Sequence, residues 1–325
     1  MIQIINPQNG CFLFNEGNNL VDEQGNNFPI INGIHRFTLQ NNYTENFGFQ
    51  WNIFAETQID QVKMNEFNQS KIRFFKETGW KPEDLDGLNI LEAGSGAGRF
   101  SQVILNQTKA SLYSFDYSNA VEANLRNNEH FESNRFHLVQ ASIYEIPFPD
   151  NSFDKVFCFG VLQHTPNFEN SISSLVAKTK PGGEIVVDFY RINGWYTKLS
   201  AKYLLRPLTR KIQHERLLNI ITKNINWMIN LFDFFCFVKL GVLTRFLPIT
   251  DLRNFPSELN SQQRIEWAIL DSFDMFSPEY DNPQRIKKVV AMFTRLNVEV
   301  TFAGLIYNDE LKCPSAVVRA VKKSN

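Results

Sequence analysis

The sequence predicts an α/β protein in which a mostly parallel sheet carries helices on both faces. Between residues 88 and 190, short apolar segments typical of strands alternate with segments whose apolar residues recur at helical spacing. Such alternation requires crossover connections, which are right-handed in nearly all parallel sheets. After Asn193 the alternation stops, and it resumes only near Gln284, so residues 193–283 are expected to form an insertion.

The expected elements follow the apolar pattern in chain order. Helices are expected at residues 98–107, 118–127, 168–178 and 284–296. Strands are expected at 88–92, 111–115, 135–139, 153–159, 183–189, 298–305 and 315–321, which makes seven. The 325 residues therefore divide into a small extension (1–40), a helical lead-in (41–80), a sheet domain in two pieces (81–192 and 284–325) and a helical cap (193–283).

The loop after the first expected strand is rich in glycine. Residues 89–100 read NILEAGSGAGRF, with Gly94, Gly96 and Gly98 between the strand and the next helix. Glycine accepts positive φ and lets another backbone or a ligand approach closely. Free N–H groups at a helix start favour polar or anionic ligand groups. A tight turn, found in any α/β protein, is the alternative interpretation.

The spacing of this loop distinguishes two classes of ligand. A dinucleotide fingerprint needs G-x-G-x-x-G, whereas these three glycines are each two residues apart and follow Glu92. The next strand ends in Asp116, whose carboxylate is placed to accept hydrogen bonds from a ribose diol. The residues therefore favour a nucleoside ligand over the pyrophosphate of an NAD-type cofactor.

Four segments in order resemble the class I S-adenosylmethionine-dependent methyltransferases. They are E-x-G-x-G-x-G at 92–98, the acidic end of the second strand, YEIPFPDNSFDKVFCFGVLQHTPN at 144–167, and KPGGEIVVDFY at 180–190. The resemblance resumes near residue 284 and covers about half of the chain. It implies a Rossmann-like fold whose seven-stranded sheet ends in an antiparallel strand, with S-adenosylmethionine as the cofactor.

The resemblance also implies which residues bind this cofactor. Glu92 would bind the methionine amino group directly or through water, Asp116 would hold the ribose, and Tyr117 would lie beside the adenine. Where the family often has an acidic residue after the third strand, this chain has Ser142, so a weaker side-chain contact or one from the backbone around Ile143 is expected. The expected cofactor-binding residues are Glu92, Gly94, Ser95, Gly96, Gly98, Asp116, Tyr117, Ser142, Ile143 and Phe159.

His164 and Tyr190 are the candidates for catalysis. The sulfonium is an activated donor, so the protein mainly aligns the acceptor, and a base helps where the acceptor is a hydroxyl. His164 follows the fourth strand, at the edge of the sheet where such ligands bind. A histidine that only holds its loop is the alternative. Tyr190 and Arg191, after the fifth strand, would line the acceptor site, and no metal site is expected.

The expected cap mixes apolar and basic residues. An apolar stretch at 227–243 is interrupted by Asp233 and Lys239, and it is too short and too charged for a membrane span. The cap would either bury its apolar face on the sheet domain or present a basic amphipathic surface to a membrane or a lipid-linked substrate. WAILDSFDMFSPEYDNP, residues 267–283, is expected to be a loop, facing either the pocket or the solvent.

The first residues resemble a small zinc-ribbon-like module. CFLFNEGNNLVDEQGNNFPIINGIHRF, residues 11–37, is similar to a degenerate member of the Trm112 family. Only Cys11 remains there as a thiol, and one thiolate cannot form a tetrahedral site, so no zinc is expected. The segment that contains Gln50 and Trp51 resembles the lead-in helix of fused methyltransferases. The resemblance implies that these two residues close over the cofactor. Packing of Trp51 into the core is the alternative.

Composition limits the classes of partner. The formal net charge is −1, from 33 basic and 34 acidic residues, so no nucleic-acid partner is expected. The start lacks a signal-peptide pattern, and no C-x-x-C pair occurs among Cys11, Cys158, Cys236 and Cys313, so a cytoplasmic location is expected.

The expected function is S-adenosylmethionine-dependent methylation, at oxygen or nitrogen, of a small molecule or a glycan, including a lipid-linked glycan. A non-catalytic binding protein of the same fold is one alternative. An NAD-linked oxidoreductase is the other, and the shortened glycine spacing disfavours it.

Overall fold

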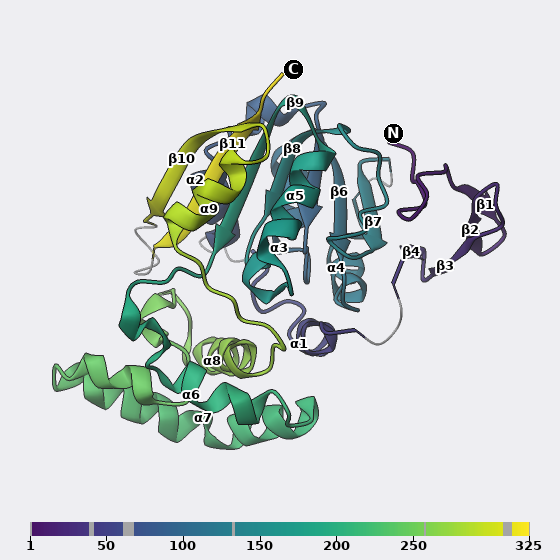
Figure 1. The fold of residues 1–325 in the computed structure, drawn as a ribbon. Helices are drawn as coiled ribbons and strands as arrows, with labels where there is room; N and C mark the ends of the chain where they lie inside the picture. Colours follow the sequence, from purple (N-terminus) through teal and green to yellow (C-terminus); the bar gives the residue numbers. More distant parts are fainter. Residues whose placement is uncertain are drawn as a thin grey trace.

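The protein is represented by a computed structural model that describes residues 2–38, 42–60, 68–131, 134–256, 258–307 and 314–324. Cys313 lies outside these residues. A twisted central sheet forms one part of the molecule, and a group of helices lies along one end of its strands (Figure 1).

The seven predicted strands form the greater part of this sheet, in the order β7-β6-β5-β8-β9-β11-β10. Neighbours from β7 to β9 pair in parallel, whereas β11 is antiparallel to both β9 and β10. The predicted parallel sheet with an antiparallel last strand is therefore confirmed. The strands are β5 (Asn89–Ala93), β6 (Ser111–Asp116), β7 (Phe136–Gln140), β8 (Phe153–Cys158), β9 (Thr179–Phe189), β10 (Val298–Ile306) and β11 (Ser315–Lys322).

The N-terminal segment continues the sheet beyond β7. β4 pairs in parallel with β7, and the sheet reaches eleven strands within the described residues, so the predicted count of seven is too low. The physical reason is that an edge strand presents unpaired N–H and C=O groups, and β4 supplies partners for part of that edge. The four added strands are β1 (Phe14–Glu16), β2 (Asn19–Val21), β3 (Asn27–Ile31) and β4 (Ile34–Arg36).

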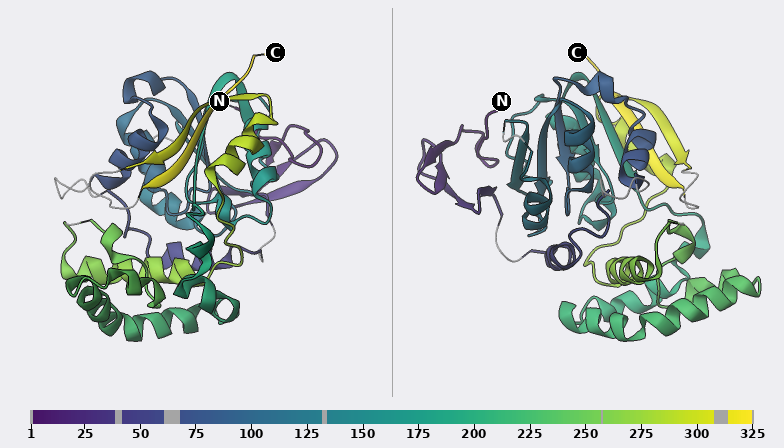
Figure 2. Two further views of the ribbon diagram at one scale, coloured as in Figure 1. Left: turned by 60° about the vertical axis from the view of Figure 1, so that its left-hand side comes forward. Right: turned by 180° about the vertical axis from the view of Figure 1, so that it is seen from behind.

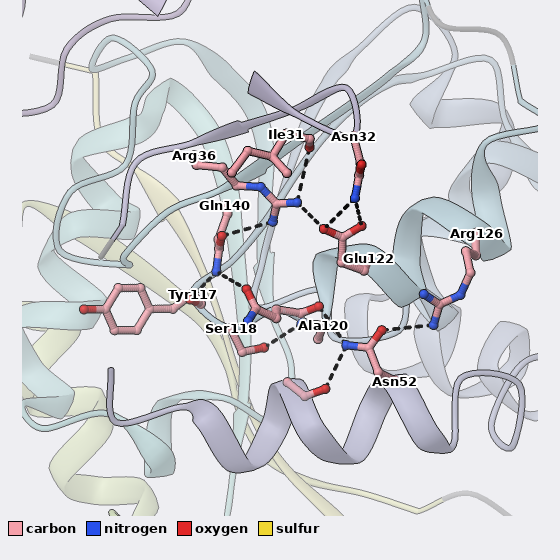
Figure 3. A network of polar contacts seen from close by, with 12 residues as sticks. Ile31, Asn32, Arg36, Asn52, Tyr117, Ser118, Ala120, Glu122, Arg126 and Gln140 are labelled. Carbon is pink, nitrogen blue, oxygen red and sulfur yellow. Dashed lines mark hydrogen bonds and ion pairs between the residues drawn. The ribbon is translucent and has the colours of Figure 1, made fainter. Parts of the chain in front are cut away.

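A polar network fixes β4 to the rest of the sheet (Figure 3). The Arg36 guanidinium donates to Gln140 Oε1 on β7 at 3.0 Å and forms an ion pair with Glu122 of α4 (Val121–Asn128). Gln140 Nε2 in turn donates to the backbone oxygen of Tyr117 at 3.1 Å. The N-terminal segment is thereby connected to the loop that follows β6.

Helices cover both faces of the sheet, as predicted (Figures 1 and 2). Leu91 and Ala93 of β5 belong to the core under α5 and α9, whereas Ile90 belongs to the core under α2 and α3. Because both faces are buried, the strands are nearly continuous apolar runs. These helices are α2 (Gln69–Thr78), α3 (Arg99–Gln107), α5 (Phe168–Lys178) and α9 (Ile286–Thr294), with short 3-10 turns η1 (Pro82–Leu85) and η2 (Leu162–His164).

The helices within residues 193–256 and 258–283 form a layer beside α1 (Figure 1). α7 and α8 enclose an apolar core of their own, which includes Ile225, Phe232 and Phe273. None of the helices in the described ranges has the length and apolar character that crossing a membrane requires. The elements are α1 (Glu45–Ile53), η3 (Trp195–Lys198), α6 (Ala201–Thr209), α7 (His214–Phe237), η4 (Gly241–Phe246), η5 (Leu252–Asn254) and α8 (Ser261–Phe276).

Candidate active site

A cavity of about 750 Å³ lies where the carboxyl ends of the parallel strands meet α1 and the cap. The loops after β5, β6, β7, β8 and β9 line it, together with residues of α1, α6 and α8. Ligands of open α/β sheets bind at this end of the strands, and the volume lies within the usual range of roughly 300–1,000 Å³ for small-molecule sites.

Two glycines of the loop after β5 are required by the packing of the chain itself. Gly94 and Gly98 have φ angles of +76° and +83°. A methyl group on Gly94 would come within 2.3 Å of Val161 Cγ2, and one on Gly98 within 2.1 Å of Asn124 Oδ1. The close approach that the motif predicts is therefore made, at these two positions, by neighbouring side chains.

Gly96, which lines the cavity as Gly94 does, differs in its neighbours, which are Asp116 and Trp51. Its N–H donates to Asp116 Oδ2 at 2.9 Å, and Trp51 Nε1 would lie 3.3 Å from a Cβ at this position. Asp116 Oδ1 accepts from the Ser118 N–H at 2.8 Å, and burial raises the pKa of Asp116. Asp116 lines the cavity, and its role as ribose acceptor stays a prediction.

Glu92 lies behind the glycine loop and does not line the cavity. Its carboxylate accepts hydrogen bonds from the hydroxyls of Ser101 and Ser114, the latter at 2.6 Å. Burial raises the pKa of Glu92 to about 7, although the two serine hydroxyls oppose the shift. Glu92 is expected to contact the methionine amino group either directly or through a water molecule. Because its side chain lies outside the cavity lining, only the contact through water is compatible with this position.

Tyr117 and Ile143, which are predicted to lie at the adenine, and Phe159, which is predicted to bind the cofactor, all line the cavity. Tyr43 packs against Tyr117, with ring centroids 5.2 Å apart. Ser142 lies outside the lining, where its hydroxyl accepts from the Tyr144 N–H at 3.2 Å. The contact with adenine is expected either from the Ser142 side chain or from the backbone around Ile143. Only the segment at Ile143 lines the cavity.

Two residues of the cavity wall carry oxygens without a hydrogen-bond partner among the described residues. They are Gln50 Oε1 on α1 and Ser95 Oγ in the glycine loop. A buried polar atom left unpaired costs about 1–3 kcal/mol, so a ligand that donates hydrogen bonds here would be stabilised. The amino and hydroxyl groups of S-adenosylmethionine are such donors, and the residues present therefore fit this cofactor.

His164 and Tyr190 lie together in the wall of the cavity. His164 Nδ1 lies 2.9 Å from the Tyr280 carbonyl oxygen, and its ring packs between Phe47 and Tyr190, with centroids 5.0 and 5.5 Å away. Burial lowers the pKa of His164, although the carboxylates of the cap oppose the shift. Tyr190 Oη donates to Asp274 Oδ2 at 3.2 Å. Arg191, expected beside them, also lines the cavity.

The segment 267–283 was expected to be a loop, but its first ten residues belong to α8. Its apolar residues explain the difference, because Leu270, Phe273 and Phe276 are buried at helical spacing. Asp271 and Asp274, on the same helix, line the cavity. Of the two positions expected for this segment, facing the pocket is therefore correct for these two carboxylates.

Several charged residues of the cavity were missed by the sequence analysis. Arg73 of α2 forms ion pairs with Glu77 and with Asp188, at the end of β9. Arg99 donates to Gln58 Oε1 at 2.6 Å, and burial lowers its pKa to about 10. Of these residues, only Arg99 could have been identified from the sequence, because it directly follows the last glycine of the motif. In the described ranges, no group of three or more His, Cys, Asp or Glu is placed to hold a metal ion.

Comparison with known proteins gives a family for the sheet domain. Residues 91–187 match the family described as "Methyltransferase domain". The chain is 24% identical over 204 residues to the tRNA U34 carboxymethyltransferase of Sulfurovum sp. (strain NBC37-1), covering 62% of each protein. It is 30% identical over 122 residues to the protein of the same name from Nautilia profundicola, covering 37% of this chain and 41% of the relative. The chain thus spans less than two thirds of the length of these relatives.

A solved structure of similar fold is the magnesium protoporphyrin IX methyltransferase of Synechocystis PCC 6803 with bound SAH. It covers 87% of this chain and 97% of its own, with a TM-score of 0.45 and 16% identity.

These comparisons correct one expectation and decide another. Nucleic acid was excluded as a partner on the basis of net charge, but the names of the two relatives above specify a tRNA, so that exclusion is wrong. Net charge failed as a criterion because it averages over the chain and conceals how charge is distributed. The family match decides against an NAD-linked oxidoreductase. Residues 91–187 are a methyltransferase domain of the class I S-adenosylmethionine-dependent family, and S-adenosylmethionine is its cofactor.

Proposed function

We propose that the chain transfers a methyl group from S-adenosylmethionine to an oxygen or nitrogen atom of an acceptor bound between the sheet and the cap. One observation carries the proposal. The glycine loop and Asp116, here called the cofactor side, line the same cavity as His164 and Tyr190, here called the acceptor side. A cofactor and an acceptor bound there would share one space, and alignment of the two reactants is the main contribution a protein makes to such a reaction.

The cofactor side binds and orients. Asp116 is proposed to accept hydrogen bonds from the ribose, and Gln50 and Ser95 to accept them from the amino group. Trp51, whose ring lies against Gly96, covers this side and excludes water. When bound, the cofactor supplies a methyl group that its sulfonium already activates.

His164 is proposed as the base for a hydroxyl acceptor. Its Nδ1 faces a carbonyl oxygen, which can only accept, so Nδ1 carries the proton and Nε2 keeps its lone pair. The lowered pKa keeps the ring neutral at neutral pH, which is the form that a base requires. In the alternative, the same hydrogen bond only ties the loop after β8 to residue 280. Turnover of a His164 variant separates the two.

The acceptor is proposed to be a small molecule or a glycan, including a lipid-linked glycan. Support comes from the polar lining of the cavity, where Tyr203, Asp274 and Lys202 carry hydrogen-bonding groups suited to a polyhydroxylated ligand. A tRNA acceptor is the second candidate, and the similarity to the tRNA U34 carboxymethyltransferases favours it.

Isothermal titration calorimetry of the purified chain with S-adenosylmethionine and with NAD tests the proposal. We expect saturable binding of the first and none of the second, and a chain that binds no S-adenosylmethionine would contradict the proposed activity. Incubation with methyl-labelled cofactor and separate pools of metabolites, glycans, lipid-linked glycans and tRNA then identifies the acceptor. Label found in tRNA alone would replace the small-molecule or glycan acceptor by RNA.

A further inference from the structure

The cap carries most of the exposed large apolar residues in the described part of the chain. The described residues include 21 of them, and 15 lie between residues 195 and 246. Monomeric soluble proteins rarely expose contiguous apolar patches of more than a few hundred Å², and larger ones mark interaction sites. We name these 15 the cap patch: Trp195, Tyr196, Leu199, Leu204, Leu205, Leu208, Ile220, Trp227, Phe234, Phe237, Val238, Leu240, Val242, Leu243 and Phe246.

Helix α7 shows that the cap patch is a second apolar face and not the edge of a core. Its inner face, which includes Ile221 and Met228, packs in the core shared with α8. Its outer face carries Ile220, Trp227 and Phe234, which recur every seven residues and so lie on one line along the helix. In Figure 1, α7 is the outermost helix of the cap, on the side away from the sheet.

The patch is densest at the end of α7. Phe237 is 84% exposed, and Trp195 of η3 is 83% exposed. η3 and η4 are held together there, because Arg245 donates to the Tyr196 backbone oxygen at 2.6 Å and its guanidinium lies 5.5 Å from the Tyr196 ring. The exposed apolar residues of η3, η4 and the end of α7 therefore lie on neighbouring segments.

The same segment is strongly basic. Residues 195–256 contain ten Lys and Arg against three Asp and Glu, a net charge of +7, whereas the whole chain has −1. Arg216, Lys223 and Lys239 are exposed, and their side chains have no ion pair or hydrogen bond within the described part of the chain. Arg216 and Lys223 share the outer face of α7 with Trp227, so charge and apolar surface are presented together.

We propose that the cap patch binds the surface of a bilayer that contains anionic lipids, with α7 lying in the interfacial plane. Amphipathic helices with aromatic, leucine and basic residues bind in this way without crossing the membrane. Basic side chains reach the lipid phosphates while their stems stay in contact with apolar surface. The inference goes beyond the proposed methyl transfer and does not depend on it.

Two other occupants fit the patch less well. Nine of its fifteen residues are aliphatic, and aliphatic side chains cannot stack on bases, whereas single-stranded nucleic acid is bound through aromatic stacking and basic grooves. A second copy of the chain would bring two segments of charge +7 together, and like charges across an interface are unfavourable.

The position of α6 relates the patch to the cavity. Lys202 and Tyr203 of α6 line the cavity, while Leu204, Leu205 and Leu208 of the same helix belong to the cap patch. An acceptor held in the bilayer surface would therefore need to pass only one helix to reach the site.

Sedimentation of the purified chain with vesicles tests the proposal. We expect binding to vesicles of phosphatidylcholine and phosphatidylglycerol, weaker binding to phosphatidylcholine alone, and loss of the difference at high salt. Trp227→Ser and Phe237→Ser should each weaken binding about tenfold, and Lys223→Gln and Lys239→Gln about fivefold each.

Phe12→Ser and Phe14→Ser are the matched controls, because both residues are about half exposed but lie on the N-terminal segment. We expect them to leave vesicle binding unchanged. Equal losses in the controls would overturn the proposal, as would the absence of vesicle binding. Binding of tRNA in place of vesicles would assign the patch to nucleic acid. Dimerisation that Trp227→Ser abolishes, measured by sedimentation velocity, would assign it to a second copy.

Discussion

The two sides of the cavity are assembled over very different distances along the chain. On the cofactor side, the hydrogen bond between Gly96 and Asp116 spans 20 residues. On the acceptor side, the bond between His164 and the Tyr280 carbonyl spans 116 residues. The cofactor side is therefore a local unit of two neighbouring strands and their loops, whereas the acceptor side exists only while the cap is docked on the sheet.

Because the two sides are assembled from different parts of the chain, we expect substitutions on each side to change a different measured property. Changes on the acceptor side should lower turnover while leaving cofactor affinity intact. Changes in the local unit should act on cofactor affinity or on the stability of the sheet domain. A substitution on the acceptor side that lowered cofactor affinity would show that the two sides are coupled, as would a substitution on the cofactor side that lowered turnover at saturating cofactor.

The largest effect is expected for His164→Gln. If Nε2 of His164 takes the acceptor proton, kcat should fall by about 10²–10⁴-fold, the usual contribution of a general base. Cofactor affinity should change little, because His164 is not among the residues proposed to bind the cofactor. Since burial lowers its pKa, the acidic limb of the wild-type rate profile should lie below the ordinary value of about 6.5, and the variant should lack that limb.

His130→Gln is the matched control for this experiment, because His130 is exposed and lies outside the cavity. It should keep both the rate and the acidic limb. A His164→Gln protein that loses melting temperature but keeps near-normal turnover would assign this histidine to holding its loop.

The sequence was sufficient for the sheet, because each buried strand is a short apolar run that carries its own signal. It was insufficient for the edge of the sheet. β4 has only three residues, and nothing local indicates that it pairs with β7, more than one hundred residues later. The same limit applies to 267–276, where turn-like Asp and Ser residues conceal the helical spacing of Leu270 and Phe273.

For the site, the motif placed Gly96 and Asp116 correctly at the cavity, because both belong to one strand–loop–strand unit. Glu92 lies behind the loop and outside the cavity lining, and its expected contact with the amino group stays a prediction, since spacing alone does not say which way a strand residue points. Arg73 and Asp188 come from elements far apart in sequence, so their ion pair across the cavity wall was not predictable.

A pH-dependent effect on stability is expected for Glu92→Gln. The folded protein holds the Glu92 proton up to a pKa of about 7, whereas the unfolded chain releases it near 4.5. Wild-type stability therefore falls as pH rises through this window, and the glutamine variant does not titrate. The variant should gain up to about 3 kcal/mol on wild type between pH 4.5 and 7, since one pH unit is worth about 1.4 kcal/mol.

Urea denaturation of both proteins at pH 5 and pH 8 measures this gain, because the other titrating groups cancel in the difference. Ser101 and Ser114 still find an acceptor in the glutamine oxygen, so the fold should persist. A difference that does not change with pH would contradict a buried, proton-holding Glu92. A large loss of cofactor affinity in the variant would show that Glu92 takes part in binding the amino group.

The smallest effect is expected for Asp116→Ala, which tests the cofactor side directly. Loss of hydrogen bonds to a charged acceptor should weaken S-adenosylmethionine binding by about 1–3 kcal/mol. The protein should still fold, because Asp116 is only partly buried at the end of β6, although the N–H groups of Gly96 and Ser118 lose an acceptor.

Asp150→Ala is the matched control, since it removes a carboxylate paired with Lys178 outside the cavity. Calorimetry should show a weaker Kd for the first variant only, with kcat at saturating cofactor close to wild type, because the acceptor side is assembled from other elements. Equal affinity in both variants would remove Asp116 from the ribose role.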